Sequence, residues 1–299
     1  MTAQLPSATA GPDHEGGGAL RVTFYGVRGS TPCPCDTNRR YGGNTACVAL
    51  EVPGEDPIIL DLGTGLRFFG LTQPTDGTFR GTALITHLHW DHVQGLPFFT
   101  PVDRPGARLD VIGPRQSGVD LAAAFEEFMR PPYFPVRAAD LRGEIVFHDL
   151  AEADVAVGNA KVRIRPVPHV GETNGYRVDW AGVSVAYISD HQAPLDRSER
   201  VSDAVLELCD GVDLLIHDAQ YTPEEWEEKA HWGHCSVDFA VKVARESGAR
   251  RLALFHHDPG HGDDFVDGLL EHARRVAQGC GIDEVLAAAE GMRFDLARA

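Results

Sequence analysis

Residues 85–92 read ITHLHWDH and place three histidines and an aspartate within six positions. The segment follows an apolar run typical of a buried strand, so these side chains stand where a strand gives way to a loop. His87 and His89 are two residues apart and point to the same side in extended backbone. Asp91 and His92 follow, where the chain must turn. The spacing therefore predicts that one segment supplies His87 and His89 to one metal ion, and Asp91 and His92 to a second ion beside it.

Further side chains able to bind metal stand at the ends of later predicted strands. His169 closes RIRPVPH, Asp190 closes VSVAYISD, and His256 with His257 closes RLALFHH. Imidazoles with carboxylates suit zinc, so we expect two divalent ions, zinc in the first place and manganese or iron as alternatives. A carboxylate such as Asp190 can bridge two ions ~3.5–4 Å apart. Adjacent residues point to opposite sides, so only one of His256 and His257 can face the metals, and spacing leaves the choice open.

The chain from residue 20 onward alternates short apolar runs with glycine-rich turns before helix–strand units take over. Strands are predicted at 20–29, 44–52, 57–65, 81–87, 109–114, 144–150, 161–169, 175–182, 183–190, 212–220 and 250–258, and helices at 117–129, 198–211, 236–249 and 263–281. This order indicates an α/β protein whose sheets carry helices on their outer faces. Because no linker interrupts the pattern, residues 20–299 are expected to form one domain.

Composition narrows the classes of function. A net charge of −17 over 299 residues argues against wrapping a long nucleic acid, since such proteins carry a clustered basic face. A small anionic substrate held by metal ions is compatible with this charge. No apolar run approaches the roughly 18 residues of a membrane helix. Residues 1–19 lack the features of a signal peptide and are expected to be a disordered leader. The six cysteines lack a metal or redox spacing, so reduced thiols and a cytoplasmic location are expected.

The pattern H-x-H-x-D-H at residues 87–92 resembles the signature of the metallo-β-lactamase superfamily, and the resemblance covers nearly the whole chain from residue 20. LDLGTG around Asp61 is similar to a turn that lies just behind the family's metal site. The chain looks most like the phosphodiesterase branch that contains the tRNA 3′-processing enzyme RNase Z and cyclic-nucleotide phosphodiesterases. HVGETNGYRV, LLIHDAQY, GHCS and LALFHH resemble, in turn, that branch's third-ligand histidine with G-Y-R, its H-E-A-T motif, its H-S-T motif and its L-x-L-T-H motif. The fold this implies is a four-layer αββα sandwich.

The resemblance also implies a role for each site residue. One metal would be held by His87, His89 and His169, and the second by Asp91, His92 and His256, with Asp190 bridging the two. It favours His256 over His257 as ligand. Asp91, His234 and Asp218 would be the catalytic residues: a metal-bridging hydroxide would attack phosphorus, and His234, oriented by Asp218, would protonate the leaving oxygen. Alternatives are a helix-start role for His234 beside an N-cap at Ser236, and a purely structural role for Asp218.

One departure from the branch bears on the substrate. RNase Z-type enzymes carry a glycine-rich, basic arm that grips tRNA, and residues 115–145 contain nothing similar. We therefore expect a binuclear phosphodiesterase acting on a small, nucleotide-like phosphodiester, a cyclic nucleotide above all. The alternatives are an RNA 3′-end nuclease, a thioesterase or lactonase, and a nucleotide sensor without catalysis. A homodimer is expected by analogy with the branch.

Five further residues could lie near the site. The sequence leaves the roles of four of them open, and the fifth is expected only to pack against the protein. Tyr133 and Phe134 are candidates for a base-stacking wall, a dimer contact or an aromatic plug in the core. Arg28 and Asn44 could meet phosphate or ribose, but a role in stabilising turns is favoured. Trp90, between two predicted ligands, is expected to pack against the protein.

Overall fold

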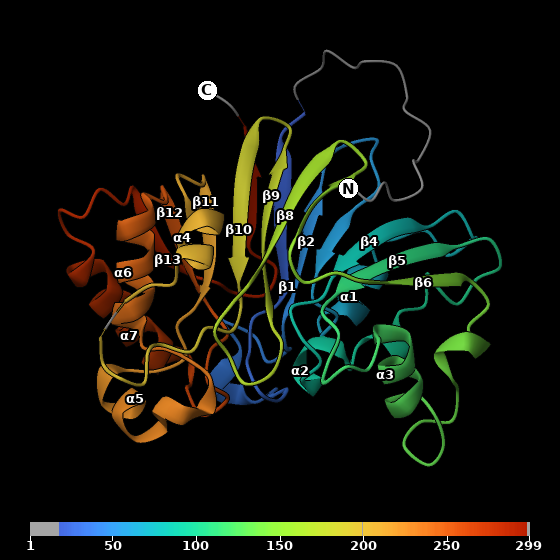
Figure 1. Ribbon diagram of the computed structural model, residues 1–299, viewed down its shortest axis with the longest axis horizontal. Helices are drawn as coiled ribbons and strands as arrows, with labels where there is room; N and C mark the ends of the chain where they lie inside the picture. Colours follow the sequence, from blue (N-terminus) through green and yellow to red (C-terminus); the bar gives the residue numbers. More distant parts are fainter. Residues whose placement is uncertain (1–17, 199, 298–299) are drawn as a thin grey trace.

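The computed structural model describes residues 18–198 and 200–297, so the predicted leader lies outside the described residues apart from its last two positions. Within these ranges two seven-stranded sheets pack face to face, and helices cover the outer face of each sheet (Figure 1). This arrangement confirms the predicted αββα sandwich. No helix in the described ranges is long and apolar enough to cross a membrane.

The first sheet combines an antiparallel part with a parallel part. Its order is β14-β1-β2-β3-β4-β5-β6, and β3 to β6 run parallel. Its strands are β1 (Leu20–Gly26), β2 (Cys47–Glu51), β3 (Ile58–Leu60), β4 (Arg80–Leu84), β5 (Arg108–Gly113), β6 (Glu144–Asp149) and β14 (Arg293–Leu296). The helices on this side are short: α1 (Leu66–Gly70), α2 (Trp90–Val93) and α3 (Leu121–Phe128).

The second sheet has the same division, with order β13-β12-β11-β10-β9-β8-β7 and parallel pairing from β10 to β13. Its strands are β7 (Ala153–Val157), β8 (Ala160–Pro166), β9 (Asn174–Trp180), β10 (Val183–Ile188), β11 (Leu214–Asp218), β12 (Arg251–Phe255) and β13 (Glu284–Ala287). Its helices are α4 (Asp203–Cys209), α5 (Pro223–Lys229), α6 (Val237–Ser247) and α7 (Asp263–Val276). The hairpin between β9 and β10 turns at Ala181 and Gly182, both with positive φ.

Apolar side chains fill three layers. One lies between the sheets and includes Phe24, Tyr176 and Phe255. The others lie between each sheet and its helices. Central strands are therefore covered on both faces and read as continuous apolar runs; β10 is buried at every position.

The topology brings the site together at one edge. Parallel strands end on the same side of a sheet, so the loops that follow β3 and β4 in the first sheet meet those that follow β10, β11 and β12 in the second. This edge faces downward in Figure 1, where α2 and α5 lie.

Candidate metal centre

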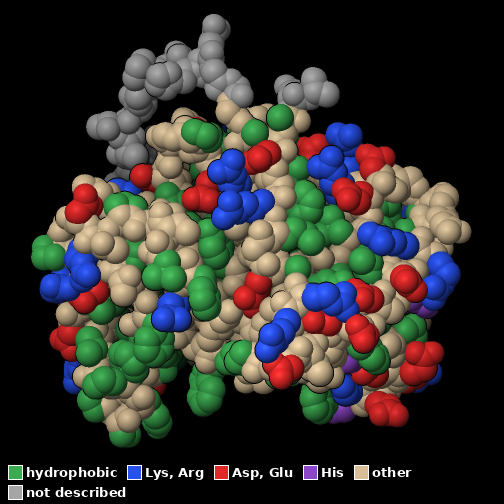
Figure 2. Space-filling view, turned by 180° about the vertical axis from the view of Figure 1, so that it is seen from behind, with side chains coloured by type: hydrophobic (Ala, Val, Ile, Leu, Met, Phe, Trp, Pro, Cys, Tyr) green, Lys and Arg blue, Asp and Glu red, His purple; other side chains and the backbone are tan. Residues whose placement is uncertain are grey.

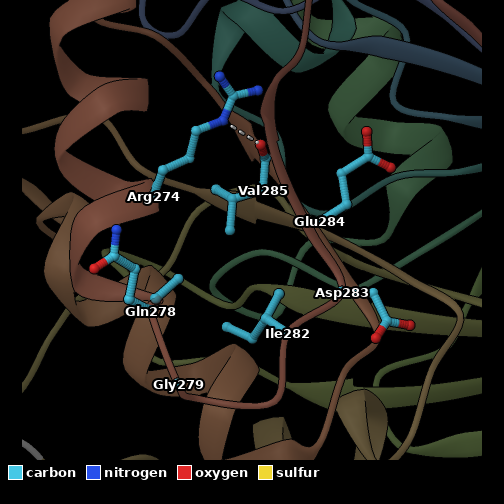
Figure 3. Close-up of a pocket in the computed structure, with 8 residues that line it drawn as sticks. Arg274, Gln278, Gly279, Ile282, Asp283, Glu284 and Val285 are labelled. Atoms are coloured by element: carbon cyan, nitrogen blue, oxygen red, sulfur yellow. Dashed lines mark hydrogen bonds between the residues drawn. The ribbon is translucent and has the colours of Figure 1, made fainter.

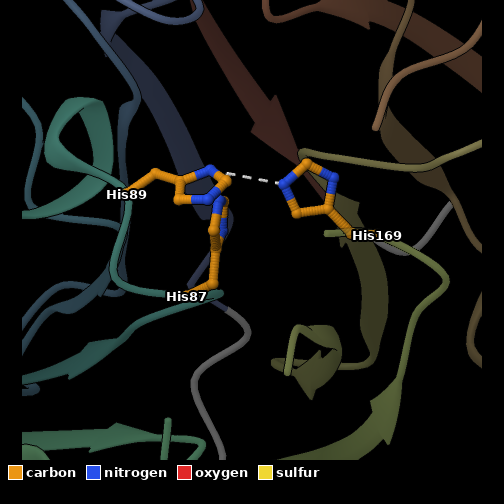
Figure 4. Close-up of side chains that lie close together, drawn as sticks. All are labelled: His87, His89 and His169. Carbon is orange, nitrogen blue, oxygen red and sulfur yellow. Dashed lines mark hydrogen bonds between the residues drawn. The ribbon is translucent and has the colours of Figure 1, made fainter. Parts of the chain in front are cut away.

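Seven donor side chains from both sheets converge at this edge. In one group, His87, His89 and His169 each place a ring nitrogen within 4.8 Å of the others (Figure 4). In a second group, a carboxylate oxygen of Asp91 and ring nitrogens of His92 and His256 lie within 4.8 Å of one another. The structure thus brings together the residues that the sequence proposed for each metal, while their binding of metal stays a prediction.

Asp190 lies between the two groups. Its Oδ2 is 3.2 Å from His92 Nε2, and its Oδ1 is 3.4 Å from His256 Nε2. The same Oδ1 is 3.9 Å from His87 Nε2. Burial alone would raise the pKa of Asp190, but the surrounding imidazoles outweigh burial and hold the pKa well below its usual range. An ionised carboxylate in this position fits the bridging role predicted for it.

The side chains of His256 and His257 point to opposite sides, as expected for adjacent residues at the end of a strand. His256 Nε2 lies 3.1 Å from Asp91 Oδ2, within the second group. His257 turns into the protein, where its Nε2 donates to the Ala288 carbonyl at 2.9 Å, and burial lowers its pKa to about 3. The geometry therefore offers His256, not His257, to a metal.

The donor set fits divalent cations. His87 Nε2 is buried and has no hydrogen-bond partner in the described structure, although it points among the other donors. Burial, reinforced by the neighbouring His92, lowers the pKa of His87 well below its usual value, so its ring is neutral. A neutral imidazole is the form that binds metal, and a cation would satisfy the unpaired nitrogen.

Buried carboxylates and carbonyls orient these rings from behind. Asp61 Oδ2 accepts hydrogen bonds from His92 Nδ1 at 2.8 Å and from the Tyr187 hydroxyl at 2.9 Å. The Gly233 carbonyl accepts from His169 Nδ1 at 2.6 Å. Such bonds fix the tautomer and direction of a metal-binding imidazole. Asp61 lies behind the site, as the family resemblance implied, whereas nothing in the local sequence pointed to Tyr187 or Gly233.

The loop after β1 supports the second group. The Ser30 amide donates to Asp91 Oδ2 at 2.7 Å. Gly29 packs directly under the His256 ring: a Cβ at this glycine would lie 2.3 Å from the ring atoms Cε1 and Nδ1. His256 Nδ1 in turn donates to the Gln220 side-chain oxygen at 3.0 Å. Sequence reasoning missed Gly29, Ser30 and Gln220, since their roles depend on contacts between distant segments.

Asp218 and His234 form a pair next to the donors. His234 Nδ1 donates to Asp218 Oδ2 at 3.0 Å and lies 3.7 Å from Asp190 Oδ1. Burial alone would lower the pKa of His234, but the carboxylates of Asp218 and Asp190 outweigh it and raise the pKa above its usual value. Ser236 caps α6 by accepting from the Phe239 amide at 3.3 Å. The predicted N-cap is therefore present, and His234 still faces the site.

Two positions with open roles are structural. Arg28 is fully buried and donates to the backbone carbonyls of Gly42, Asp258 and His261. Asn44 donates through its side chain to the Glu290 carboxylate at 2.9 Å.

The aromatic positions lie nearer the surface. Hydrophobic side chains gather at the lower left of Figure 2, the end of the molecule where Figure 1 places α3. Tyr133 is 74% exposed, so it is not a core plug, whereas Phe134 packs edge-on against Phe98 with ring centroids 5.8 Å apart. Trp90 is 75% exposed, and the expectation that it packs against the protein is wrong.

Several of the donors line a pocket of about 500 Å³. Its lining includes His89, Asp91, Asp190, His234 and His256, together with Trp90 and Trp232. A second hollow lies between α7 and β13, where Arg274 Nε donates to the Val285 carbonyl at 3.0 Å (Figure 3). None of the seven donors lines this second hollow, which lies between α7 and the edge strand β13.

Comparison with known proteins identifies the family of the chain. A family model described as a beta-lactamase superfamily domain matches residues 69–257. Ribonuclease Z of Ignicoccus hospitalis is 26% identical over 268 residues, which cover 73% of this chain and 83% of that protein. The structure of human tRNase Z, short form, superposes with a TM-score of 0.66 at 21% identity and covers 93% of this chain and 100% of that one. A diphosphatase from the PhnP family gives a TM-score of 0.65 at 21% identity, with 93% and 98% covered.

The chain therefore belongs to the metallo-β-lactamase superfamily. Within that superfamily its relatives place it in the RNase Z-like branch, and it is a metal-dependent hydrolase.

Proposed function

We propose that this chain is a binuclear metal-dependent phosphodiesterase that hydrolyses a small phosphodiester of the nucleotide class, with cyclic nucleotides as the first substrates to test. One observation carries the proposal: Asp190 lies between two groups of three donors, close to His87 of the first and to His92 and His256 of the second, and the His234–Asp218 pair lies beside them.

The protein's own residues account for binding and proton transfer. His87, His89 and His169 would hold one ion, and Asp91, His92 and His256 the other, with Asp190 between them. When bound, the ions supply positive charge for the phosphate oxygens and lower the pKa of a water molecule. His234 Nδ1 is occupied by Asp218, which leaves Nε2 to donate a proton to the departing oxygen. Asp218 also accepts from the His191 amide at 3.0 Å, so its direction is fixed.

Size and charge support a small substrate. A pocket of about 500 Å³ has the volume of a nucleotide-sized ligand site. On the face in Figure 2, basic side chains alternate with acidic ones and form no continuous patch. Together with the net charge of −17, this disfavours a long polyanion.

A second candidate, RNA 3′-end processing, is favoured by the names of the relatives. The curated relative from Ignicoccus hospitalis is a ribonuclease Z, and one of the similar structures is a human tRNase Z. The donors and the His234–Asp218 pair would serve either substrate, because the bond cleaved is of the same type.

A substrate panel separates the candidates. The full chain would be assayed with zinc, with manganese and after chelation, on bis(p-nitrophenyl) phosphate, 2′,3′- and 3′,5′-cyclic nucleotides, precursor tRNA and a thioester. We expect metal-dependent hydrolysis of bis(p-nitrophenyl) phosphate and of at least one cyclic nucleotide. Cleavage of precursor tRNA alone would assign the nuclease function instead, and turnover of the thioester alone would exclude a phosphodiesterase. The choice of zinc, the homodimer, the cytoplasmic location and the single domain stay predictions.

A further inference from the structure

Two exposed tryptophans stand at the pocket beside the donors. Trp90 begins α2 and lies in sequence between His89 and Asp91. Trp232 ends the short 3₁₀ helix η4 (Ala230–Trp232), two residues before His234. Both rings line the pocket of about 500 Å³, and they are 75% and 59% exposed. Figure 1 shows α2 beneath the first sheet and α5, which leads into η4, beneath the second.

This exposure is not general among the tryptophans of the chain. Trp180 is 3% exposed, within the core between the sheets. Trp226 is partly buried and donates from its indole nitrogen to the His234 carbonyl at 3.2 Å. A large aromatic ring left in water forgoes the stabilisation that burial gives, so a pair of such rings beside polar donors indicates a surface that a ligand covers.

Trp232 is held near the donors by the segment that carries it. The next residue, Gly233, has φ of +94° and its carbonyl bonds to His169 Nδ1. A Cβ at Gly233 would lie 2.5 Å from the His169 ring, so this backbone presses directly on a donor. Lys229 Nζ, at the end of α5, lies 5.9 Å from the centre of the Trp232 ring, within range of a cation–π contact.

Trp90 is placed beside the donors by its position in the chain. Its sequence neighbours His89 and Asp91 belong to the two donor groups, so its backbone lies between them and its side chain starts at the edge of the site. Leu88 and the half-exposed Val170 add apolar surface to the same pocket.

We propose that Trp90 and Trp232, the tryptophan pair, stack on a nucleobase joined to the phosphate that the donors receive. This inference rests on the proposed phosphodiesterase function and names the residues that would favour a nucleotide over an alkyl phosphodiester. Stacking tolerates any base because every base has a flat π-face. A neutral base also meets no repulsion from the acidic protein.

A binding experiment tests the pair without relying on turnover. The zinc-loaded full chain would be titrated by calorimetry with AMP and with ribose 5-phosphate, which share phosphate and sugar and differ only in the base. We expect AMP to bind at least about fivefold more tightly, since stacking of one base is worth ~1 kcal/mol or more. Trp232→Ala and Trp90→Ala should each reduce this preference severalfold, while Trp232→Phe and Trp90→Phe retain most of it.

Controls keep the outcomes distinct. Tyr133→Ala removes an aromatic ring that is equally exposed but is not among the residues lining the pocket, and it should leave the preference unchanged. Zinc content of each variant would be measured to show that the donors are intact. Equal affinity of the wild-type chain for the two ligands, or a preference that survives both alanine variants, would overturn the inference. If the zinc-loaded wild-type chain does not hydrolyse bis(p-nitrophenyl) phosphate, the phosphodiesterase proposal itself is overturned.

Discussion

Replacement of Gly29 by alanine tests whether His256 belongs to the metal centre. The added Cβ would lie 2.3 Å from His256 Cε1 and Nδ1, whereas ordinary contact begins at 3.4 Å, so the ring must move by 1.1 Å (3.4 − 2.3). The backbone cannot easily yield in its place, because the Gly29 amide is bonded to the His257 carbonyl at 3.0 Å. His256 is also buried and bonded through Nδ1 to Gln220.

A shift of this size exceeds what metal coordination tolerates, which is ~0.2 Å in a ligand distance. We expect Gly29→Ala to bind the second ion at least ~10-fold more weakly and to lose ~10²-fold in kcat, the usual result of a displacement of about 1 Å. Zinc per chain would be measured after dialysis against buffered zinc, and kcat with bis(p-nitrophenyl) phosphate. Two ions held with wild-type affinity and a kcat within about twofold of wild type would refute the assignment of His256.

The matched control is Gly268→Ala in the middle of α7. A Cβ there meets nothing within 4 Å. Alanine is the better helix former, so this variant should keep both ions and gain about 0.5–1 kcal/mol in the free energy of unfolding.

Three further changes probe the proton donor, the support of a ligand and the electrostatics of the first sheet. His234→Asn should retain both ions while kcat falls ~10²-fold or more; loss of an ion would show that the side chain is a ligand. Asp61→Asn should weaken metal binding ~10- to 100-fold in a zinc competition assay, because His92 Nδ1 loses its carboxylate acceptor; unchanged affinity would contradict this. Burial alone would raise the pKa of Asp110, but the hydrogen bonds that its carboxylate accepts from Arg108 and His148 outweigh burial and lower the pKa. The carboxylate therefore stabilises the fold above its unfolded pKa of ~3.9, and this contribution is lost as the pH falls through the lower folded value. Asp110→Asn should cost about 1–2 kcal/mol in urea unfolding at pH 7 and clearly less at pH 3; an equal cost at both pH values would contradict the pKa shift.

Local pattern was enough for most of the fold. The strands β10 and β12 are continuous apolar runs, and α6 lies between the N-cap Ser236 and the left-handed Gly248. The strands β7, β13 and β14 were not predicted. The segment Arg293–Leu296 alternates charge with apolar side chains over only four residues, and it becomes a strand because β1 offers it an edge to pair with.

At the site, too, local sequence was enough to find some residues, whereas others depend on contacts between distant segments. Donor residues could be found from sequence because each stands in the marked pattern of residues 87–92 or at the end of a strand. The contacts that hold them could not: Gly29 lies under His256 and Gly233 on His169 only after distant segments have packed. The wrong expectation for Trp90 has the same origin, because its neighbours in sequence do not determine whether another loop covers it.

Each donor group draws on both sheets, and this has a consequence for how the protein matures. His87, His89, Asp91 and His92 emerge early from the ribosome, but one group is incomplete until residue 169 arrives and the other until residue 256. A nascent chain that has formed only β1 to β6 would offer each ion an incomplete set of donors and would therefore bind it weakly. If both groups bind metal as proposed, tight loading would come only after the second sheet has formed. The bound ions would then link the two sheets, so chelation should also lower the unfolding temperature.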